Sequence, residues 1–196
     1  DPQIKTIMED VINPLYGAYE GLLTARQRRE PLELNVPEAV VDIDNYGKIL
    51  GVIERPNLES HKLIEEFMIA ANIVAAETLK NNQQSFLYRV HEEPPKDKLE
   101  AFRDFSDSLR LKLPRGQVVR PSHFNNLIER ATKLDFGSVI SGAVLRAQSK
   151  ARYTPEDRGH FGLALRHYCH FTSPIRRYAD LLVHRALISV LNLGDG

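Results

Sequence analysis

The sequence is poor in cysteine, has no long apolar run and shows no internal repeat. Its single cysteine, Cys169, excludes an internal disulfide framework and agrees with the reducing conditions of the cytoplasm. No stretch approaches the roughly 20 consecutive apolar residues of a membrane-spanning helix. The first residues, 1–3, lack the charged and apolar regions of a secretory signal. We therefore expect a cytoplasmic protein without a membrane partner.

The chain also lacks a net charge, and this absence taken alone speaks against a nucleic-acid partner. The distribution of charge points the other way. Residues 146–185 contain eight Lys or Arg and three Asp or Glu, a net charge of +5, while the first 145 residues carry −4. A basic C-terminal quarter suits phosphate groups, although a solvated basic face explains the same pattern.

Apolar residues form 42% of the 196 residues and charged residues 27%, a balance that predicts one folded domain or part of a larger one. Hydrophobic spacing and turn residues predict a mixed α+β fold that is rich in helix. The expected helices cover residues 2–30 (interrupted near 13–14), 58–80, 93–111, 121–134, 139–150 and 174–193, and the expected strands form a hairpin at 40–43 and 49–53 and a further strand at 86–90. We expect a polar loop at 153–159 and an extended segment at 161–171.

The longest predicted helix, over residues 58–80, has an apolar stripe and a candidate cap. Asn57 or Ser60 is a suitable N-cap residue. The residues expected to face the core share one side of the helix, and they are Leu63, Phe67, Ala70, Ala71 and Val74.

Two polar residues of the same helix lie beside that stripe. Glu65 and Asn72 are seven residues apart, so they share one face. A carboxylate there can accept a hydrogen bond from a ribose hydroxyl, and contact with the 2′-OH is how proteins distinguish RNA from DNA. The alternative is that Glu65 and Glu66 form a solvent-facing pair without a ligand.

The strongest local signal is residues 170–180, His-Phe-Thr-Ser-Pro-Ile-Arg-Arg-Tyr-Ala-Asp. Ser173 is placed to cap a helix, with a proline at the first helical position. Arg176 and Arg177 then fall in the first turn, where the helix dipole disfavours cations. Two arginines at this end are explained if an anion binds there, and a guanidinium with free backbone N–H groups suits a phosphate.

An acidic residue follows these arginines at helical spacing. Asp180 lies four residues after Arg176 and three after Arg177, so it can brace one guanidinium and leave the other free. The alternative is that both arginines pair with carboxylates elsewhere in the fold, in which case neither binds a ligand.

Two weaker patterns lie just upstream. His167 and His170 have a spacing seen in metal sites, but on an extended segment they face opposite sides and no second ligand pair is present. We therefore expect no metal site. Gly159 and Gly162 do not match a phosphate-binding loop, and we expect them to permit a turn or close packing.

Several blocks of the sequence resemble one enzyme family. Residues 158–165 with 170–185, residues 61–72 and residues 88–94 are similar to blocks of the RNB catalytic domain of the ribonuclease II/ribonuclease R family. The similarity runs in register from about residue 15 to 191, and the ribonuclease R-like branch is the closer one. The resemblance implies an α+β, helix-rich partial RNB catalytic domain with a small β-sheet.

The resemblance also implies an activity. Enzymes of this family hydrolyse single-stranded RNA processively from the 3′ end to 5′-mononucleotides, using Mg²⁺ held by clustered aspartates. Arg176 matches the arginine that holds a phosphate near the scissile bond, and Glu65 matches a ribose contact. The further RNA contacts expected in the same block are His170, Ser173, Arg177 and Tyr178.

The chain departs from the family pattern in three respects. The aspartate-rich metal motif has no match, since Asp42 and Asp44 are too few. Leu34, a further expected RNA contact, stands where the family has an aromatic residue that wedges between bases, so we expect no stacking there. The flanking RNA-binding domains have no counterpart in residues 1–196. We therefore expect a partial domain that binds no Mg²⁺ by itself and is inactive alone. The alternatives are a non-catalytic RNA-binding or assembly module and a structural remnant without RNA affinity.

Overall fold

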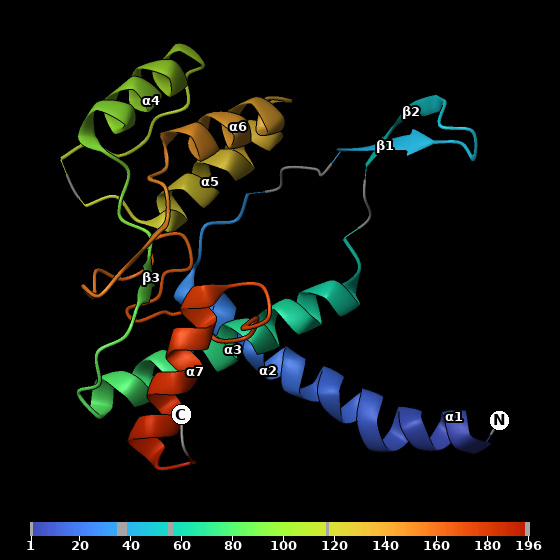
Figure 1. Cartoon of the computed structure of the whole chain (residues 1–196). Coiled ribbons are helices and arrows are strands. Elements are labelled where there is room, and N and C mark those ends of the chain that lie inside the picture. Colours follow the sequence, from blue (N-terminus) through green and yellow to red (C-terminus); the bar gives the residue numbers. More distant parts are fainter. Residues whose placement is uncertain (1, 35–38, 55–56, 117, 195–196) are drawn as a thin grey trace.

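A computed structural model describes residues 2–34, 39–54, 57–116 and 118–194 (Figure 1). The predicted α+β, helix-rich fold is confirmed, although the strands form two small antiparallel sheets, β1–β2 and β3–β4, rather than one. The helical segments are α1 (Pro2–Ile7), the π-helical turn η1 (Met8–Ile12), α2 (Asn13–Arg29), α3 (Glu59–Asn81), α4 (Lys96–Ser108), α5 (Pro121–Thr132), α6 (Gly137–Ala147) and α7 (Tyr178–Leu191), and the strands are β1 (Ala39–Ile43), β2 (Ile49–Glu54), β3 (Tyr88–Val90) and β4 (Arg152–Thr154). None of the helices in the described part of the chain is long and apolar enough to cross a membrane.

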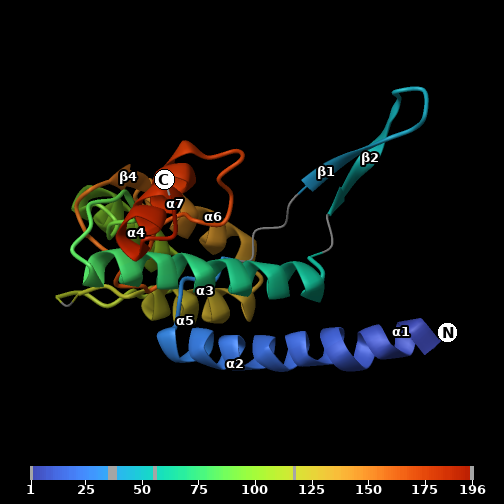
Figure 2. The same cartoon turned by 60° about the horizontal axis from the view of Figure 1, so that its bottom comes forward.

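The N-terminal helical segment is a long rod whose C-terminal part lies beside α3 (Figure 2). The π-helical turn η1 ends at Ile12, two residues before Pro14, which cannot donate a backbone hydrogen bond. A wider helical turn accommodates the missing donor without ending the rod. The helix is therefore irregular at residues 8–12, just before the predicted interruption near residues 13–14, and residues 13–14 themselves are helical.

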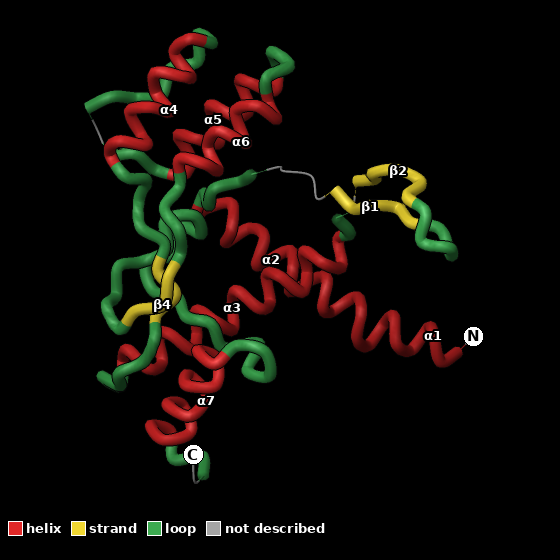
Figure 3. Tube along the Cα trace, turned by 45° about the horizontal axis from the view of Figure 1, so that its top comes forward, coloured by secondary structure: helices red, strands yellow, loops and turns green. Residues whose placement is uncertain are grey.

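The predicted hairpin is confirmed, and its turn is held by one carboxylate. Oδ1 of Asp44 accepts the backbone N–H groups of Tyr46 at 2.8 Å and Lys48 at 2.9 Å, and Gly47 has a φ of 83°. The strands β1 and β2 stand apart from the helices (Figure 3). The exposed apolar side chains along them are Val40, Val41, Ile43, Ile49, Leu50, Val52 and Ile53.

Two hydrophobic clusters lie at either end of the helical body. The first is built by α4, α5 and α6 around Phe102, Phe124 and Ile140. The second joins α3, β3 and α7 through Leu79, Val90 and Val183. The loops between β4 and α7 run between these clusters, so both cores fix the position of the segment that carries the predicted site.

The buried face of α3 differs from the predicted one. Val74 was expected inside but is 61% exposed, whereas Glu66 and Asn72 are buried. The buried residues of α3 are Leu63, Glu66, Ile69, Asn72, Ala75, Ala76 and Leu79. Glu66 and Asn72 can be buried because side chains of other segments bind them. A prediction from hydrophobicity alone therefore places the buried face too far round the helix. The predicted caps Asn57 and Ser60 are also wrong, because Leu58 is the N-cap and no side chain caps the helix.

The C-terminal third differs from the prediction in three places. Residues 153–154 of the predicted loop at 153–159 belong instead to strand β4, because they pair with β3, and residues 161–164 form a turn rather than an extended segment. The last helix begins at Tyr178, not at residue 174. Ser173 is not its N-cap, since its carbonyl instead accepts the N–H groups of Arg176 at 3.3 Å and Arg177 at 3.1 Å and closes a turn before the helix.

Candidate functional site

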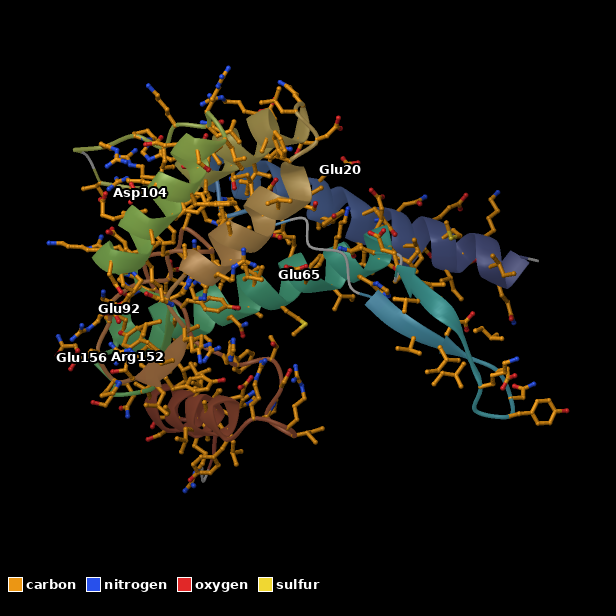
Figure 4. All side chains as sticks on the ribbon, turned by 90° about the horizontal axis from the view of Figure 1, so that it is seen from above. Glu20, Glu65, Glu92, Asp104, Arg152 and Glu156 are labelled. Atoms are coloured by element: carbon orange, nitrogen blue, oxygen red, sulfur yellow. The ribbon has the colours of Figure 1, made fainter. Side chains whose placement is uncertain are left out.

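A groove of about 460 Å³ lies between α3 and the segment that precedes α7. Glu65 and Asn72 enter it from α3, and His170 and Arg177 enter it from the other side (Figure 4 labels Glu65). The prediction that Glu65 and Asn72 share a face is confirmed. The full lining is His61, Ile64, Glu65, Met68, Ile69, Asn72, Leu163, Tyr168, His170 and Arg177.

Asn72 joins the two walls of the groove. Its Nδ2 donates to the hydroxyl of Tyr168 at 2.9 Å, and its Oδ1 accepts the N–H of Phe171 at 2.8 Å. The amide is therefore engaged with protein. Glu65 is exposed beside it, and within the described residues no hydrogen bond or ion pair occupies its carboxylate. Of Glu65 and Asn72, only Glu65 is therefore available to a ligand.

The neighbouring Glu66 does not form a solvent-facing pair with Glu65. Its side chain is buried, and its Oε1 lies 2.6 Å from Nη1 of Arg26 on α2. Nη2 of Arg29 lies 4.0 Å from the other carboxylate oxygen. Adjacent glutamates thus have separate functions, one in the interface of α2 and α3 and one at the groove.

The two adjacent arginines also differ from each other. Nε of Arg177 donates to Oδ2 of Asp180 at 2.7 Å and Nη2 donates to Oδ1 at 2.8 Å. Burial raises the pKa of the Asp180 carboxyl, but hydrogen bonds from Arg177 and from the backbone N–H of Ser173 outweigh burial and lower it overall. The prediction that Asp180 braces one of the arginines is confirmed, and the braced residue is Arg177.

Arg176 is exposed, and no described residue forms a hydrogen bond or ion pair with its guanidinium. Its neighbours Ile175 and Tyr178 are also exposed, at 102% and 69%. Ser173, Arg176 and Tyr178 do not line the groove. Ser173 and Arg176 belong to the turn that ends at Arg177, which does line it, and Tyr178 begins α7. The alternative in which both arginines pair with carboxylates is therefore correct for Arg177 only.

His170 contributes a neutral ring to the groove. Its Nδ1 lies 2.7 Å from the hydroxyl of Tyr153 on β4. Burial, with a smaller contribution from Arg177, lowers the pKa of His170 to about 4. The ring is therefore uncharged at neutral pH and can exchange hydrogen bonds without adding positive charge. The sequence interpretation missed Tyr153 because it placed residues 153–159 in a loop, and the alternation of polar and aromatic residues at 152–154 is too short to indicate a strand.

Comparison with known proteins identifies the domain. The RNB domain family matches residues 3–193. The chain belongs to the RNB domain family. Ribonuclease R of Vibrio cholerae serotype O1 is 39% identical over 185 residues, covering 94% of this chain and 22% of that protein. The apo form of Mycoplasma genitalium RNase R gives a TM-score of 0.83 at 30% identity, covering 92% of this chain and 29% of that one.

The resemblance inferred from the sequence blocks is thus confirmed. A second structure of the Mycoplasma genitalium protein, in complex with ribose methylated single-stranded RNA, matches this chain equally well, with a TM-score of 0.83 over 92% of the chain. The chain spans between 22% and 28% of the length of the curated ribonuclease R relatives from Vibrio cholerae and Aquifex aeolicus.

Leu34 lies apart from the groove of this RNB domain. Its side chain is partly buried against the first hydrophobic cluster, which α4, α5 and α6 build. The groove lining does not include it. The position of Leu34 gives no support to a base contact at the groove, and its predicted part in RNA binding stays a prediction.

His167 and His170 have different partners, as their spacing predicts. Nδ1 of His167 lies 2.7 Å from Oδ2 of Asp157, which also accepts from Nζ of Lys80 at 2.7 Å. His170 instead contacts Tyr153. Across residues 2–34, 39–54, 57–116 and 118–194, no three His, Cys, Asp or Glu side chains are grouped so that they could hold a metal ion.

The two glycines have the roles expected of them. Gly159 has a φ of 72°, which permits its turn. A Cβ at Gly162 would lie 2.9 Å from Nδ1 of His91, which accepts the Gly162 N–H at 2.9 Å. This close approach places the next residue, Leu163, in the groove, where its carbonyl accepts from Nε of Arg29 at 3.1 Å.

Proposed function

We propose that this RNB domain forms the phosphate- and ribose-binding wall of a 3′→5′ exoribonuclease that hydrolyses single-stranded RNA to 5′-mononucleotides in the cytoplasm. The observation that carries the proposal is a groove lined by Glu65, whose carboxylate has no hydrogen bond or ion pair among the described residues, beside a turn that carries Arg176, whose guanidinium has none either. A guanidinium can bind a phosphate by two parallel hydrogen bonds, and a carboxylate can accept the 2′-OH.

The other groove residues suit a strand of RNA rather than a bare anion. Tyr168 and His170 present ring edges and faces, with their centroids 5.7 Å apart. Aromatic rings are stacking surfaces for unpaired bases. Because His170 is neutral, the positive charge is concentrated at the Arg176 turn, where a phosphate is expected. Mycoplasma genitalium RNase R, which shares this fold, has been solved with single-stranded and with double-stranded RNA.

The magnesium ions that the family would use do not fit the residues that the structure describes. Asp42 and Asp44 lie on the projecting hairpin, and no group of three metal-ligating side chains exists among the described residues. We therefore assign binding and orientation of RNA to this chain and assign no hydrolytic step to its residues. On this proposal the isolated chain binds RNA but does not release nucleotides.

An RNA-binding measurement with a matched control tests the proposal. The wild type, Arg176→Ala and Arg130→Ala on α5 would be titrated with end-labelled single-stranded RNA in a filter-binding assay at two salt concentrations. Arg130→Ala removes the same charge from a helix remote from the groove lining. We expect Arg176→Ala to weaken binding about tenfold and to reduce the salt slope by about one, while Arg130→Ala changes little. Equal affinities for all three proteins contradict the phosphate contact.

Incubation of the wild type with Mg²⁺ and the same RNA separates binding from hydrolysis. Retention of intact RNA is expected, whereas steady release of mononucleotides contradicts the proposed inactivity. The same pair of results addresses a second candidate, a non-catalytic RNA-binding or assembly module, which the poor fit to a metal favours. If no RNA tested binds in these titrations, the remaining interpretation is a structural remnant without RNA affinity.

A further inference from the structure

We propose that Asp180 is a positioning residue that determines which of two adjacent arginines meets the RNA backbone. By holding Arg177, it leaves Arg176 as the presented guanidinium. The inference rests on the proposed RNA-binding function and deepens it, because it explains how a block with two neighbouring cations presents a single phosphate contact.

The carboxylate of Asp180 accepts three hydrogen bonds from protein donors. Oδ1 accepts the N–H of Ser173 at 2.8 Å and Nη2 of Arg177 at 2.8 Å, and Oδ2 accepts Nε of Arg177 at 2.7 Å. Asp180 is fully buried at 0% exposure. A buried carboxylate without a cation is strongly disfavoured, so the fold requires one guanidinium at this point. Arg177, three residues earlier, provides it.

The same carboxylate closes the turn from which Arg176 projects. The carbonyl of Ser173 accepts the backbone N–H groups of Arg176 and Arg177, while the N–H of Ser173 is bound by Asp180 on α7. Both polar backbone groups of Ser173 are therefore engaged. Residues 173–177 form a closed turn fixed at its two ends, and Arg176 lies within it.

The segment before the turn is anchored independently of Asp180. Nε2 of His184 lies 2.8 Å from the carbonyl of Phe171, and the two rings stack at 4.2 Å with an interplanar angle of 13°. Asn72 on α3 accepts the N–H of Phe171. Loss of the Asp180 charge should therefore change the turn and Arg177 without releasing the whole segment from α3 and α7.

Neutralising Asp180 should make the two arginines interchangeable. In wild type, Asp180 and Arg177 cancel each other, and the turn presents one positive charge. In Asp180→Asn the amide can still accept the Ser173 N–H, but it no longer holds a guanidinium by charge. Arg177 becomes available beside Arg176, and either side chain can reach a phosphate. Dependence of RNA binding on Arg176 should then decrease.

A double-mutant cycle measures this dependence. The four proteins are wild type, Asp180→Asn, Arg176→Ala and the double variant, each titrated with end-labelled single-stranded RNA at two salt concentrations. We expect Arg176→Ala to weaken binding about tenfold in wild type but less than about threefold in the Asp180→Asn background, and we expect Asp180→Asn alone to steepen the salt slope by about one. Adding Arg177→Ala to the double variant should restore the full tenfold loss, which a general loosening of the fold would not do.

Each outcome has a distinct meaning. An equal loss on Arg176→Ala in both backgrounds overturns the positioning role of Asp180 while leaving the phosphate contact intact. No loss in either background overturns the proposed function itself. If circular dichroism shows that Asp180→Asn is unfolded, Arg177→Lys replaces it in the cycle, because an ammonium cannot bridge both carboxylate oxygens. A loss on Arg176→Ala that is unchanged in the Arg177→Lys background then overturns the inference, and a smaller loss supports it.

Discussion

Nη1 of Arg26 on α2 lies 2.6 Å from Oε1 of Glu66 on α3, and this partly buried ion pair joins the N-terminal rod to the helix that forms one wall of the groove. Arg29 extends the contact by donating to the carbonyl of Leu163 in the opposite wall. The adjacent Glu65 lines the groove, and although its charge acts on Arg26, it forms no hydrogen bond or ion pair with these arginines among the described residues. Of two neighbouring side chains on α3, Glu66 therefore joins the helices and Glu65 lines the groove.

Substitution of the two glutamates should separate these properties. Glu66→Gln leaves Arg26 and Arg29 without their buried anion, so we expect the free energy of unfolding to fall by about 3 kcal/mol. Glu65→Gln lies on the surface and should change it by less than about 0.5 kcal/mol. Urea unfolding followed by circular dichroism measures both. A larger loss for Glu65→Gln than for Glu66→Gln would reverse the assignment.

The same two variants should differ in RNA recognition. Glu65→Gln removes the charged acceptor for a 2′-OH, so the preference for single-stranded RNA over DNA of the same sequence should decrease. Competition between labelled RNA and unlabelled DNA measures this preference. An unchanged ratio of the two affinities would show that Glu65 does not contact the ribose.

The two arginines should differ in their effect on stability. Arg177→Ala leaves the buried Asp180 carboxylate without its cation, and we expect a loss of about 3–5 kcal/mol. Arg176→Ala should be neutral within about 0.5 kcal/mol, since its side chain is exposed. Because the folded pKa of Asp180 is lowered, its contribution is present above about pH 4 and is lost as the pH falls further. Urea titrations of wild type and Arg177→Ala at pH 7 and pH 3 should therefore differ less at pH 3.

Buried histidines should make the fold sensitive to mild acid. Burial and the neighbouring His91 lower the pKa of His160 to about 3, and burial lowers that of His170 to about 4. The unfolded chain binds protons below about pH 6.5, whereas these rings do not, so stability should fall by up to about 1.4 kcal/mol per pH unit for each ring as the pH drops from 6.5 to 4.

Variants identify the histidine that causes this dependence. His160→Gln should lower stability at pH 7 but flatten its decrease between pH 6.5 and pH 4. His61→Gln, at an exposed position, serves as the control and should keep the wild-type profile. A profile of His160→Gln as steep as that of wild type would contradict the prediction. The measurement is the midpoint of urea unfolding at half-unit pH intervals.

Gly162 should not tolerate a methyl group. The added Cβ would lie 2.9 Å from Nδ1 and 3.1 Å from Cε1 of His91, whose ring is held by a hydrogen bond from Nε2 to the carbonyl of Ser149 at 2.9 Å. We expect Gly162→Ala to cost about 1–3 kcal/mol. Gly21→Ala on α2 meets nothing within 4 Å and should instead stabilise by about 0.5–1 kcal/mol. Thermal unfolding of both variants shows whether each substitution raises or lowers the stability of the fold.

The sequence predicted features that depend on local chemistry. The hairpin followed from the turn residues around Asp44 and Gly47, and the irregularity in the first helix followed from Pro14, because both effects act within a few residues. The brace between Asp180 and Arg177 followed from helical spacing even though Arg177 is only the N-cap of its helix. In each case the partners are close in the chain.

The sequence predictions are wrong where a side chain binds a partner from a segment that is distant in the chain. Glu66 and Asn72 are buried because Arg26 and Tyr168 receive them, and neither pairing is visible in the periodicity of α3. Ser followed by Pro is a common start of a helix, and this local pattern predicts Ser173 as a cap. Its backbone N–H is instead bound by the carboxylate of Asp180, and this delays the helix until Tyr178.

The hairpin has a consequence for the behaviour of the purified protein. Val41 pairs with Val52 and Val40 with Ile53, so apolar side chains cover both of its faces, and each strand has an open edge. These two strands can act as a template for intermolecular cross-β pairing, since no third strand among the described residues blocks an edge of the hairpin. We expect precipitation that accelerates with concentration, and Val41→Lys or Val52→Lys should delay it.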